Sequence, residues 1–170
     1  MSDDLRIGLG IDVHRLGAGR PCVLGGIPFA SGVGPIGHSD GDAVLHAACD
    51  AVLGAAGLDD LGTLFSDRAP ENEGRASADF CAATMQLVRA RRLRVLSMDV
   101  VVETELPKLK PQRQAMRERL ALLFDLPVER VNVKGKTGEQ VDAVGRGEAM
   151  RATVVALLGP LAAPTDSGRA

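Results

Sequence analysis

The sequence contains no tryptophan, no tyrosine and only four phenylalanines. Proteins that hold single-stranded nucleic acid stack successive bases on aromatic side chains, and this composition offers few such platforms. The formal net charge of -2 and the pI near 5.9 also give no excess of basic groups to follow a phosphate backbone. We therefore expect no nucleic-acid partner.

Cysteine is scarce as well. Cys22, Cys49 and Cys81 are an odd number at irregular spacing with no CxxC pair, so they do not form a disulfide framework and suit a reducing compartment. We expect them to fill the core. No run approaches the ~20 apolar residues of a membrane-spanning helix, and the N-terminal MSDDLRIG carries acids where a secretory signal carries basic residues. These features predict a cytoplasmic protein without a membrane partner.

The residues that are present are typical of a globular protein, with 45% hydrophobic and 25% charged residues in a chain of 170. We expect one domain over residues 1–170, with an ordered core at about 5–160 and a flexible tail at 161–170. Hydrophobic periodicity predicts strands at 6–14, about 21–26, 95–104, 128–133 and 148–158 (the last ambiguous with helix), and helices at about 39–56, 77–92 and 111–124. Ser39 and Pro111 are the expected first residues of two of these helices. The pattern predicts an α/β (α+β) fold, a two-layer sandwich of a mixed sheet and about three helices.

All three histidines fall between residues 14 and 46, which is the most informative feature of the sequence. Asp12 and His14 lie two apart on the first expected strand, so they share its polar face, and the neighbouring glycines leave that face open. His46 lies in the middle of the first expected helix, with an aspartate one turn to either side, Asp42 and Asp50. Two imidazoles and one carboxylate match a zinc site with an open fourth position, and either aspartate would hold the second ring N–H of His46.

A simpler interpretation of the same residues stays open. Asp-x-His on a strand is a weak motif, and His46 is also compatible with a core histidine bonded to Asp50. His38 and Ser39 precede the helix, whose N-terminal N–H groups would suit a phosphate or would simply be capped by Ser39. Because the aspartates beside them repel a bare phosphate, an anion there makes most sense when a metal bridges it.

Two basic, glycine- or proline-rich segments follow later strands. The run 134–139, KGKTGE, is not a P-loop, because Arg130 stands where that motif needs glycine. Its Thr137 is a candidate donor to a phosphoryl oxygen and its Glu139 a candidate ligand of a hard cation such as Mg²⁺, with solvated turn residues as the alternative. Arg146 is a further candidate phosphate ligand, and the stiff loop 107–111 would hold a nucleotide or cap the third helix.

Taken together, the runs RIGLGIDVHRL, IGHSDGDAVLHAACDAVLGAAGLDDLGTLF, PKL, VNVKGKTGE and GRGE resemble the 2-C-methyl-D-erythritol 2,4-cyclodiphosphate synthase family over residues 6–158. The resemblance implies a homotrimer with active sites between subunits. It also implies cyclisation of 4-diphosphocytidyl-2-C-methyl-D-erythritol 2-phosphate, with release of CMP, in the non-mevalonate isoprenoid pathway. That reaction belongs to a phosphorus-oxygen lyase.

The same resemblance implies roles for individual residues. Zn²⁺ would bind Asp12, His14 and His46, and a second divalent cation, Mg²⁺ or Mn²⁺, would bind Glu139. His38, Ser39 and Thr137 would position the phosphates, with His38 and Thr137 taking part in catalysis. The erythritol moiety would contact Asp60, Gly62, Phe65 and Asp67, and the cytidine pocket would comprise Thr104, Pro107, Lys108, Leu109, Lys110, Gly135, Lys136 and Thr137.

The sequence departs from the family pattern at a few positions. Residues 66–70 read SDRAP where the family commonly has PDTDP, and Lys136 and Gly138 replace a more Thr-rich run. Ala143 stands where many members have a phenylalanine lining a central trimer cavity, although Arg146 is retained. Two other functions are weighed against the synthase: an inactive zinc- and nucleotide-binding protein, and a metal-dependent phosphohydrolase. The retention of Thr137 and Glu139 favours the synthase.

Overall fold

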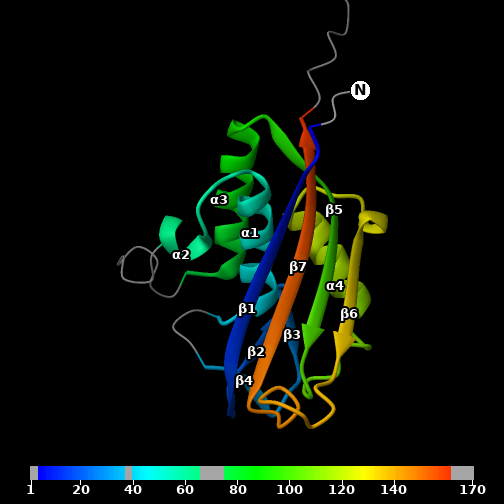
Figure 1. The fold of residues 1–170 in the computed structure, drawn as a ribbon. Coiled ribbons are helices and arrows are strands. Elements are labelled where there is room, and N and C mark those ends of the chain that lie inside the picture. Colours follow the sequence, from blue (N-terminus) through cyan, green and yellow to red (C-terminus); the bar gives the residue numbers. More distant parts are fainter. Residues whose placement is uncertain (1–3, 37–39, 66–74, 162–170) are drawn as a thin grey trace, which may run out of the picture.

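The structure, a computed structural model, describes residues 4–36, 40–65 and 75–161. Its main sheet has the strand order β4-β1-β7-β5-β6, in which β5 and β6 are parallel and the other pairs antiparallel. The helices α1, α3 and α4 cover one face of this sheet, which confirms the two-layer α/β fold (Figure 1). The strands are β1 Arg6–Ala18, β2 Cys22–Leu24, β3 Ile27–Phe29, β4 Val33–Pro35, β5 Leu93–Glu103, β6 Val131–Lys136 and β7 Ala149–Pro160. The helices are α1 Ala43–Ala55, α2 Leu61–Leu64, α3 Ser77–Ala90 and α4 Arg113–Leu123.

The alternation along β1 is confirmed. Its apolar side chains are exposed, however, whereas a strand ordinarily buries its apolar side. The apolar side chains of Ile7, Leu9 and Ile11 are exposed, by 73%, 59% and 53%. The opposite side, with Gly8 and Gly10, faces α1. A Cβ on Gly8 would lie 1.9 Å from the carbonyl oxygen of Ala51, and a Cβ on Gly10 would lie 1.9 Å from that of Ala47. The expectation that these glycines leave an open face was wrong, because the backbone of α1 occupies the space that their missing side chains provide.

The first helix begins later than the sequence suggested. Asp42 is the N-cap of α1, and its carboxylate accepts hydrogen bonds from the N–H groups of Val44 and Leu45. Ser39 is therefore not the cap, and the anion site expected at this helix end is not supported, because its first free N–H groups already have a carboxylate partner. His38 and Ser39 themselves lie outside the described residues, as do Asp67 and residues 162–170 of the expected tail.

Other helix and strand boundaries differ from the predicted ones because of local interactions. Pro111 precedes α4 instead of opening it, since Gln112 keeps a non-helical backbone as the N-cap. Residues 128–130 form a 3-10 turn before β6, where Arg117 donates to the carbonyl oxygens of Val128 and Val131. Residues Leu61–Leu64 form the short helix α2 and residues 27–35 contain β3 and β4, none of which the hydrophobic periodicity predicted.

The core lies between the sheet and the helices, and α1 is buried on almost all sides. All of its residues are buried except His46, Asp50 and Gly54, which recur every fourth position and form one outward stripe. The three cysteines are buried and free, as expected of core residues.

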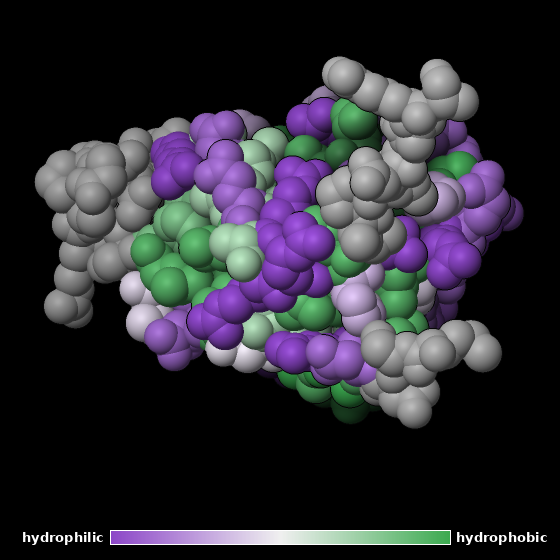
Figure 2. Space-filling model, turned by 90° about the horizontal axis from the view of Figure 1, so that it is seen from above, coloured by the Kyte–Doolittle hydropathy of each residue, from purple (hydrophilic) through white to green (hydrophobic). Residues whose placement is uncertain are grey.

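Seen from above, the surface has a hydrophilic band between hydrophobic areas (Figure 2). Among the described residues, no helix combines the length and hydrophobicity needed to cross a membrane.

Candidate metal centre and basic pocket

The structure brings Asp12 and His14 of β1 together with His46 of α1. Oδ2 of Asp12 lies 3.0 Å from Nε2 of His14 and 3.3 Å from Nδ1 of His46. One ligand atom from each residue lies within 4.8 Å of the other two, and this is the one such group among the described His, Cys, Asp and Glu side chains. The close packing of α1 on Gly8 and Gly10 produces this convergence, because it brings the helix backbone against β1.

Two of the ligand atoms in this group lack hydrogen-bond partners within the part of the chain that the structure describes. Asp12 Oδ2 and His14 Nε2 are buried, and neither has a hydrogen-bond partner of suitable geometry among the described residues, although the two atoms are close. Unpartnered buried polar atoms are unfavourable, and a cation bound by all three residues would satisfy them. Tetrahedral zinc with bonds of ~2.0–2.2 Å places its ligand atoms ~3.4 Å apart. The 3.0 and 3.3 Å separations are close to that requirement.

The carboxylate of Asp12 and the imidazole of His46 each stabilise the charged form of the other. Burial acts to raise the pKa of Asp12, but the two imidazoles beside it outweigh burial and hold that pKa well below its usual range. Burial also acts to lower the pKa of His46, and Asp12, helped by Asp42 and Asp40, reverses the effect and raises it. The cluster therefore keeps an anionic oxygen between two basic nitrogens, which is a donor set that favours a divalent metal.

The second ring nitrogen of His46 has a partner that the sequence analysis did not identify. Nε2 lies 2.9 Å from Oγ of Ser77, the first residue of α3. The expectation that Asp42 or Asp50 would hold this nitrogen was wrong, since both carboxylates bind backbone N–H groups instead. Asp42 accepts from Gly25, Gly26, Val44 and Leu45, and Asp50 accepts from Leu61. Ser77 is 31 residues from His46, so no local motif could have indicated it.

The described residues among those expected to contact erythritol, Asp60, Gly62 and Phe65, lie on or beside α2. Asp60 is the N-cap of this helix and accepts a hydrogen bond from the N–H of Thr63 at 2.7 Å. Gly62 lies within α2, and Phe65 ends it, with its ring 5.5 Å from the ring of Phe80. The Phe80 ring in turn stands 6.3 Å from the imidazole of His46, edge to face. This contact and the Leu61 N–H bond to Asp50 attach α2 to the outward stripe of α1 on which His46 lies.

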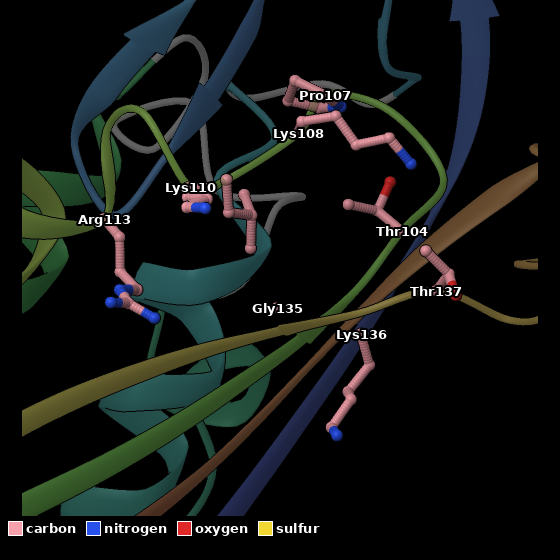
Figure 3. A pocket seen from close by; sticks show the side chains of 9 residues that line it. Thr104, Pro107, Lys108, Lys110, Arg113, Gly135, Lys136 and Thr137 are labelled. Carbon is pink, nitrogen blue, oxygen red and sulfur yellow. The ribbon is translucent and has the colours of Figure 1, made fainter.

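The residues expected to hold cytidine line a pocket of about 240 Å³. It lies where β5 and β6 end, and Figure 3 shows Lys108 extending toward Thr104 and Thr137. Lys136 points away from Lys108 and Lys110 in this view (Figure 3). The lining comprises Thr104, Pro107, Lys108, Leu109, Lys110, Arg113, Gly135, Lys136 and Thr137. Arg113 is the one member that the sequence analysis missed, because it was assigned only to the following helix.

The loop after β6 is fixed by its own polar contacts. The hydroxyl of Thr137 donates to Glu139 at 2.7 Å, and Glu105 accepts the N–H of Gly138 at 3.0 Å. Glu139 is exposed and does not join the Asp12, His14 and His46 group. Arg146 forms a two-pronged pair with Glu148, at 3.0 Å for both bonds, and is exposed. The loop thus presents a threonine hydroxyl and a carboxylate beside a basic pocket.

The two parts of the candidate site lie toward opposite edges of the sheet. Asp12 and His14 are on β1, whereas the pocket is built on β5 and β6, and β7 and β5 lie between β1 and β6. At ~4.8 Å between neighbouring strands, β1 and β6 are ~14 Å apart. One part can bind a metal and polarise an anion bound to it, and the other can bind a nucleotide through basic side chains and strand-end backbone.

Known proteins share this architecture. The model of the YgbB family matches residues 5–159. A curated 2-C-methyl-D-erythritol 2,4-cyclodiphosphate synthase from Rhodopirellula baltica is 44% identical over 153 residues, which cover 90% of this chain and 92% of the relative. The corresponding synthase from Xanthomonas axonopodis pv. citri is also 44% identical, over 96% of this chain and 99% of its own.

A solved structure agrees with these relatives. It is a 2C-methyl-D-erythritol-2,4-cyclodiphosphate synthase in its CDP-bound form, 42% identical, with a TM-score of 0.85. The match covers 91% of this chain and all of the other. The chain therefore belongs to the YgbB family of 2-C-methyl-D-erythritol 2,4-cyclodiphosphate synthases.

Proposed function

We propose that this enzyme converts 4-diphosphocytidyl-2-C-methyl-D-erythritol 2-phosphate into 2-C-methyl-D-erythritol 2,4-cyclodiphosphate and CMP, acting as a phosphorus-oxygen lyase of the non-mevalonate isoprenoid pathway. The observation that carries the proposal is the convergence of Asp12, His14 and His46, in which Asp12 Oδ2 and His14 Nε2 are buried and have no hydrogen-bond partner among the described residues. The basic pocket at the ends of β5 and β6 supports it, because the leaving group is a nucleotide.

The bond changes balance without water. An oxygen of the substrate's 2-phosphate forms a bond to the β-phosphorus, and the bond from that phosphorus to the oxygen shared with the α-phosphate breaks. That oxygen and its electron pair leave with CMP. Phosphoryl transfer of this kind depends on positioning and on neutralising charge, with little covalent work by the protein. The residues proposed for it are accordingly metal ligands, hydrogen-bond donors and pocket walls.

Asp12, His14 and His46 are the proposed ligands of one Zn²⁺ for each active site, and Glu139 is the proposed ligand of a second cation, Mg²⁺ or Mn²⁺. When bound, such cations supply Lewis-acid polarisation of phosphate oxygens and neutralise the developing charge. The partial burial of the three zinc ligands suits this role, since electrostatic attraction is stronger away from bulk water.

The remaining residues are proposed to hold the substrate. Thr137 would donate its hydroxyl to a phosphoryl oxygen, exchanging its bond to Glu139 for one to substrate, and His38 and Ser39 would position the phosphates with it. Cytidine would occupy the pocket of residues 104–110 and 135–137, against backbone and lysine stems. Asp60, Gly62, Phe65 and Asp67 would contact the erythritol moiety beside α2.

We further propose that the enzyme is a homotrimer with active sites between subunits. The exposed row of Ile7, Leu9, Ile11 and Val13 on β1 supports this assembly, because contiguous apolar surface of this kind marks an interface. The separation of the metal group and the pocket across the sheet supports shared sites, since the β1 edge of one protomer would meet the β6 edge of the next.

Phosphorus NMR tests the proposed reaction. The purified protein is incubated with the cytidine diphospho-substrate, Zn²⁺ and Mg²⁺, and we expect a cyclic diphosphate signal that grows together with CMP. Inorganic phosphate in place of the cyclic product would reject the synthase in favour of a hydrolase. His46→Ala is expected to abolish both zinc binding and CMP release. Gly54→Ala, on the same outward stripe of α1, serves as its matched control.

A further inference from the structure

A series of hydrogen bonds connects His46, one of the three proposed zinc ligands, to Ser77 at the start of α3 and then to Asp40. Oγ of Ser77 lies 2.9 Å from Nε2 of His46 and donates its proton to Oδ1 of Asp40 in a short bond. The backbone N–H of Ser77 donates to Oδ2 of the same carboxylate at 3.1 Å. Both oxygens of Asp40 therefore accept a hydrogen bond from one residue, 37 positions away in the sequence, and Oδ1 also accepts the N–H of Asp42 at 3.3 Å.

The donor and the acceptor of each of these hydrogen bonds can be assigned. A carboxylate only accepts hydrogen bonds, and a serine hydroxyl has a single proton to give. Because that proton goes to Asp40, Ser77 presents a lone pair to His46, and Nε2 of His46 must be the donor. Nδ1 is the remaining nitrogen, and it is the one that lies 3.3 Å from Asp12 inside the metal group.

We propose that Ser77 and Asp40 are positioning residues, which hold His46 with its proton on Nε2 and so direct Nδ1 to the metal. This inference rests on the proposed role of His46 as a zinc ligand. Neither residue is itself a proposed metal ligand: Ser77 acts through the imidazole of His46, and Asp40 acts through Ser77. Partners of this kind fix the tautomer and ring orientation of a metal-bound histidine.

A purely structural role is the competing explanation, and α3 gives it some basis. The N-cap of α3 is Ala76, which has no side-chain cap bond, so Asp40 also caps this helix from another part of the chain. A residue that only stabilised α3 would change the free energy of unfolding and leave zinc affinity unchanged. Zinc affinity and the protonated nitrogen of His46 are therefore the readouts that separate the two roles.

The first test compares two variants that each remove a buried hydroxyl from α3. Ser77→Ala removes the hydroxyl bonded to His46, whereas Thr84→Val removes one that has no partner among the described residues. Zinc affinity is measured by competition with a chelator. We expect Ser77→Ala to bind zinc ~10- to 100-fold more weakly, and Thr84→Val to bind it like the wild type. Equal affinities for Ser77→Ala and the wild type would overturn the proposal.

A second variant covers the case in which Ser77→Ala does not fold. In Asp40→Asn the side-chain amide can donate to Oγ of Ser77, which frees the hydroxyl proton to turn toward Nε2 of His46. We expect weaker zinc binding here too, and the loss of the Nε2 proton signal that nitrogen-resolved NMR should detect in the zinc-loaded wild type. A retained signal with wild-type affinity would refute the inference. If instead His46→Ala keeps its zinc, the proposed metal site itself has failed.

Discussion

Gly10→Ala tests whether the close approach of α1 to β1 builds the metal group. The added Cβ would lie 1.9 Å from the carbonyl oxygen of Ala47 and 2.7 Å from the backbone nitrogen of Ala51. Contacts of this kind are essentially never shorter than 3.0 Å, so the helix must move by about 1 Å. Both atoms that the Cβ meets are backbone, and no side-chain rotation can relieve the clash. Overpacking of this kind destabilises a protein by about 1–3 kcal/mol, occasionally more.

The shift of α1 should also change the distances between the proposed zinc ligands, because His46 moves with α1 whereas Asp12 and His14 stay on β1. We expect a lower midpoint of urea unfolding and a zinc affinity reduced by an order of magnitude or more. Gly54→Ala is the matched control: nothing lies within 4 Å of its added Cβ, and alanine favours a helix by about 1 kcal/mol over glycine. A Gly10→Ala protein with wild-type stability and zinc affinity would refute the packing argument.

Three other perturbations test separate parts of the account. Burial raises the pKa of Asp42 to about 6, above its ordinary 3.8, so protonation favours the folded state at low pH and this contribution is lost as pH rises through about 6. The test compares the free energy of unfolding of the wild type with that of Asp42→Asn at each pH. The wild-type value minus the Asp42→Asn value should fall by up to about 3 kcal/mol as the pH is raised from about 4 to about 6. A rise of this difference over the same range would contradict the raised pKa. Thr137→Ala should keep its zinc but cyclise about 10²-fold more slowly, as loss of a donor to a developing charge does, and an unaltered rate would remove Thr137 from the mechanism. Ile11→Asp should sediment as a monomer, whereas Leu122→Asp, also at an exposed position but on α4, should remain a trimer; a trimeric Ile11→Asp would exclude the proposed interface.

Periodicity predicted the elements well but could not say which face of β1 is covered. Alternation identifies two faces, and the apolar one would ordinarily be assigned to the core. Here Ile7, Leu9 and Ile11 are exposed, because α1 packs on the glycine side and the apolar side stays uncovered within one chain. Such an inversion depends on the tertiary packing of a helix on glycines, which the sequence of a single strand does not encode.

The site divides in the same way. Asp12 and His14 were predictable as a pair because a strand places alternate residues on one face, and His46 was joined to them by the fold as proposed. The partner of its second nitrogen was not predictable, since Asp42 and Asp50 were nearer in sequence but were already used by backbone N–H groups. Ser77 comes from a different helix, so no spacing rule could have indicated it.

The most direct test of the central claim is anomalous diffraction at the zinc absorption edge, on crystals of the wild type grown with Zn²⁺. We expect one strong peak for each protomer, in contact with Oδ2 of Asp12, Nε2 of His14 and Nδ1 of His46. A peak bound elsewhere, or zinc-saturated crystals with no peak between these three side chains, would contradict it.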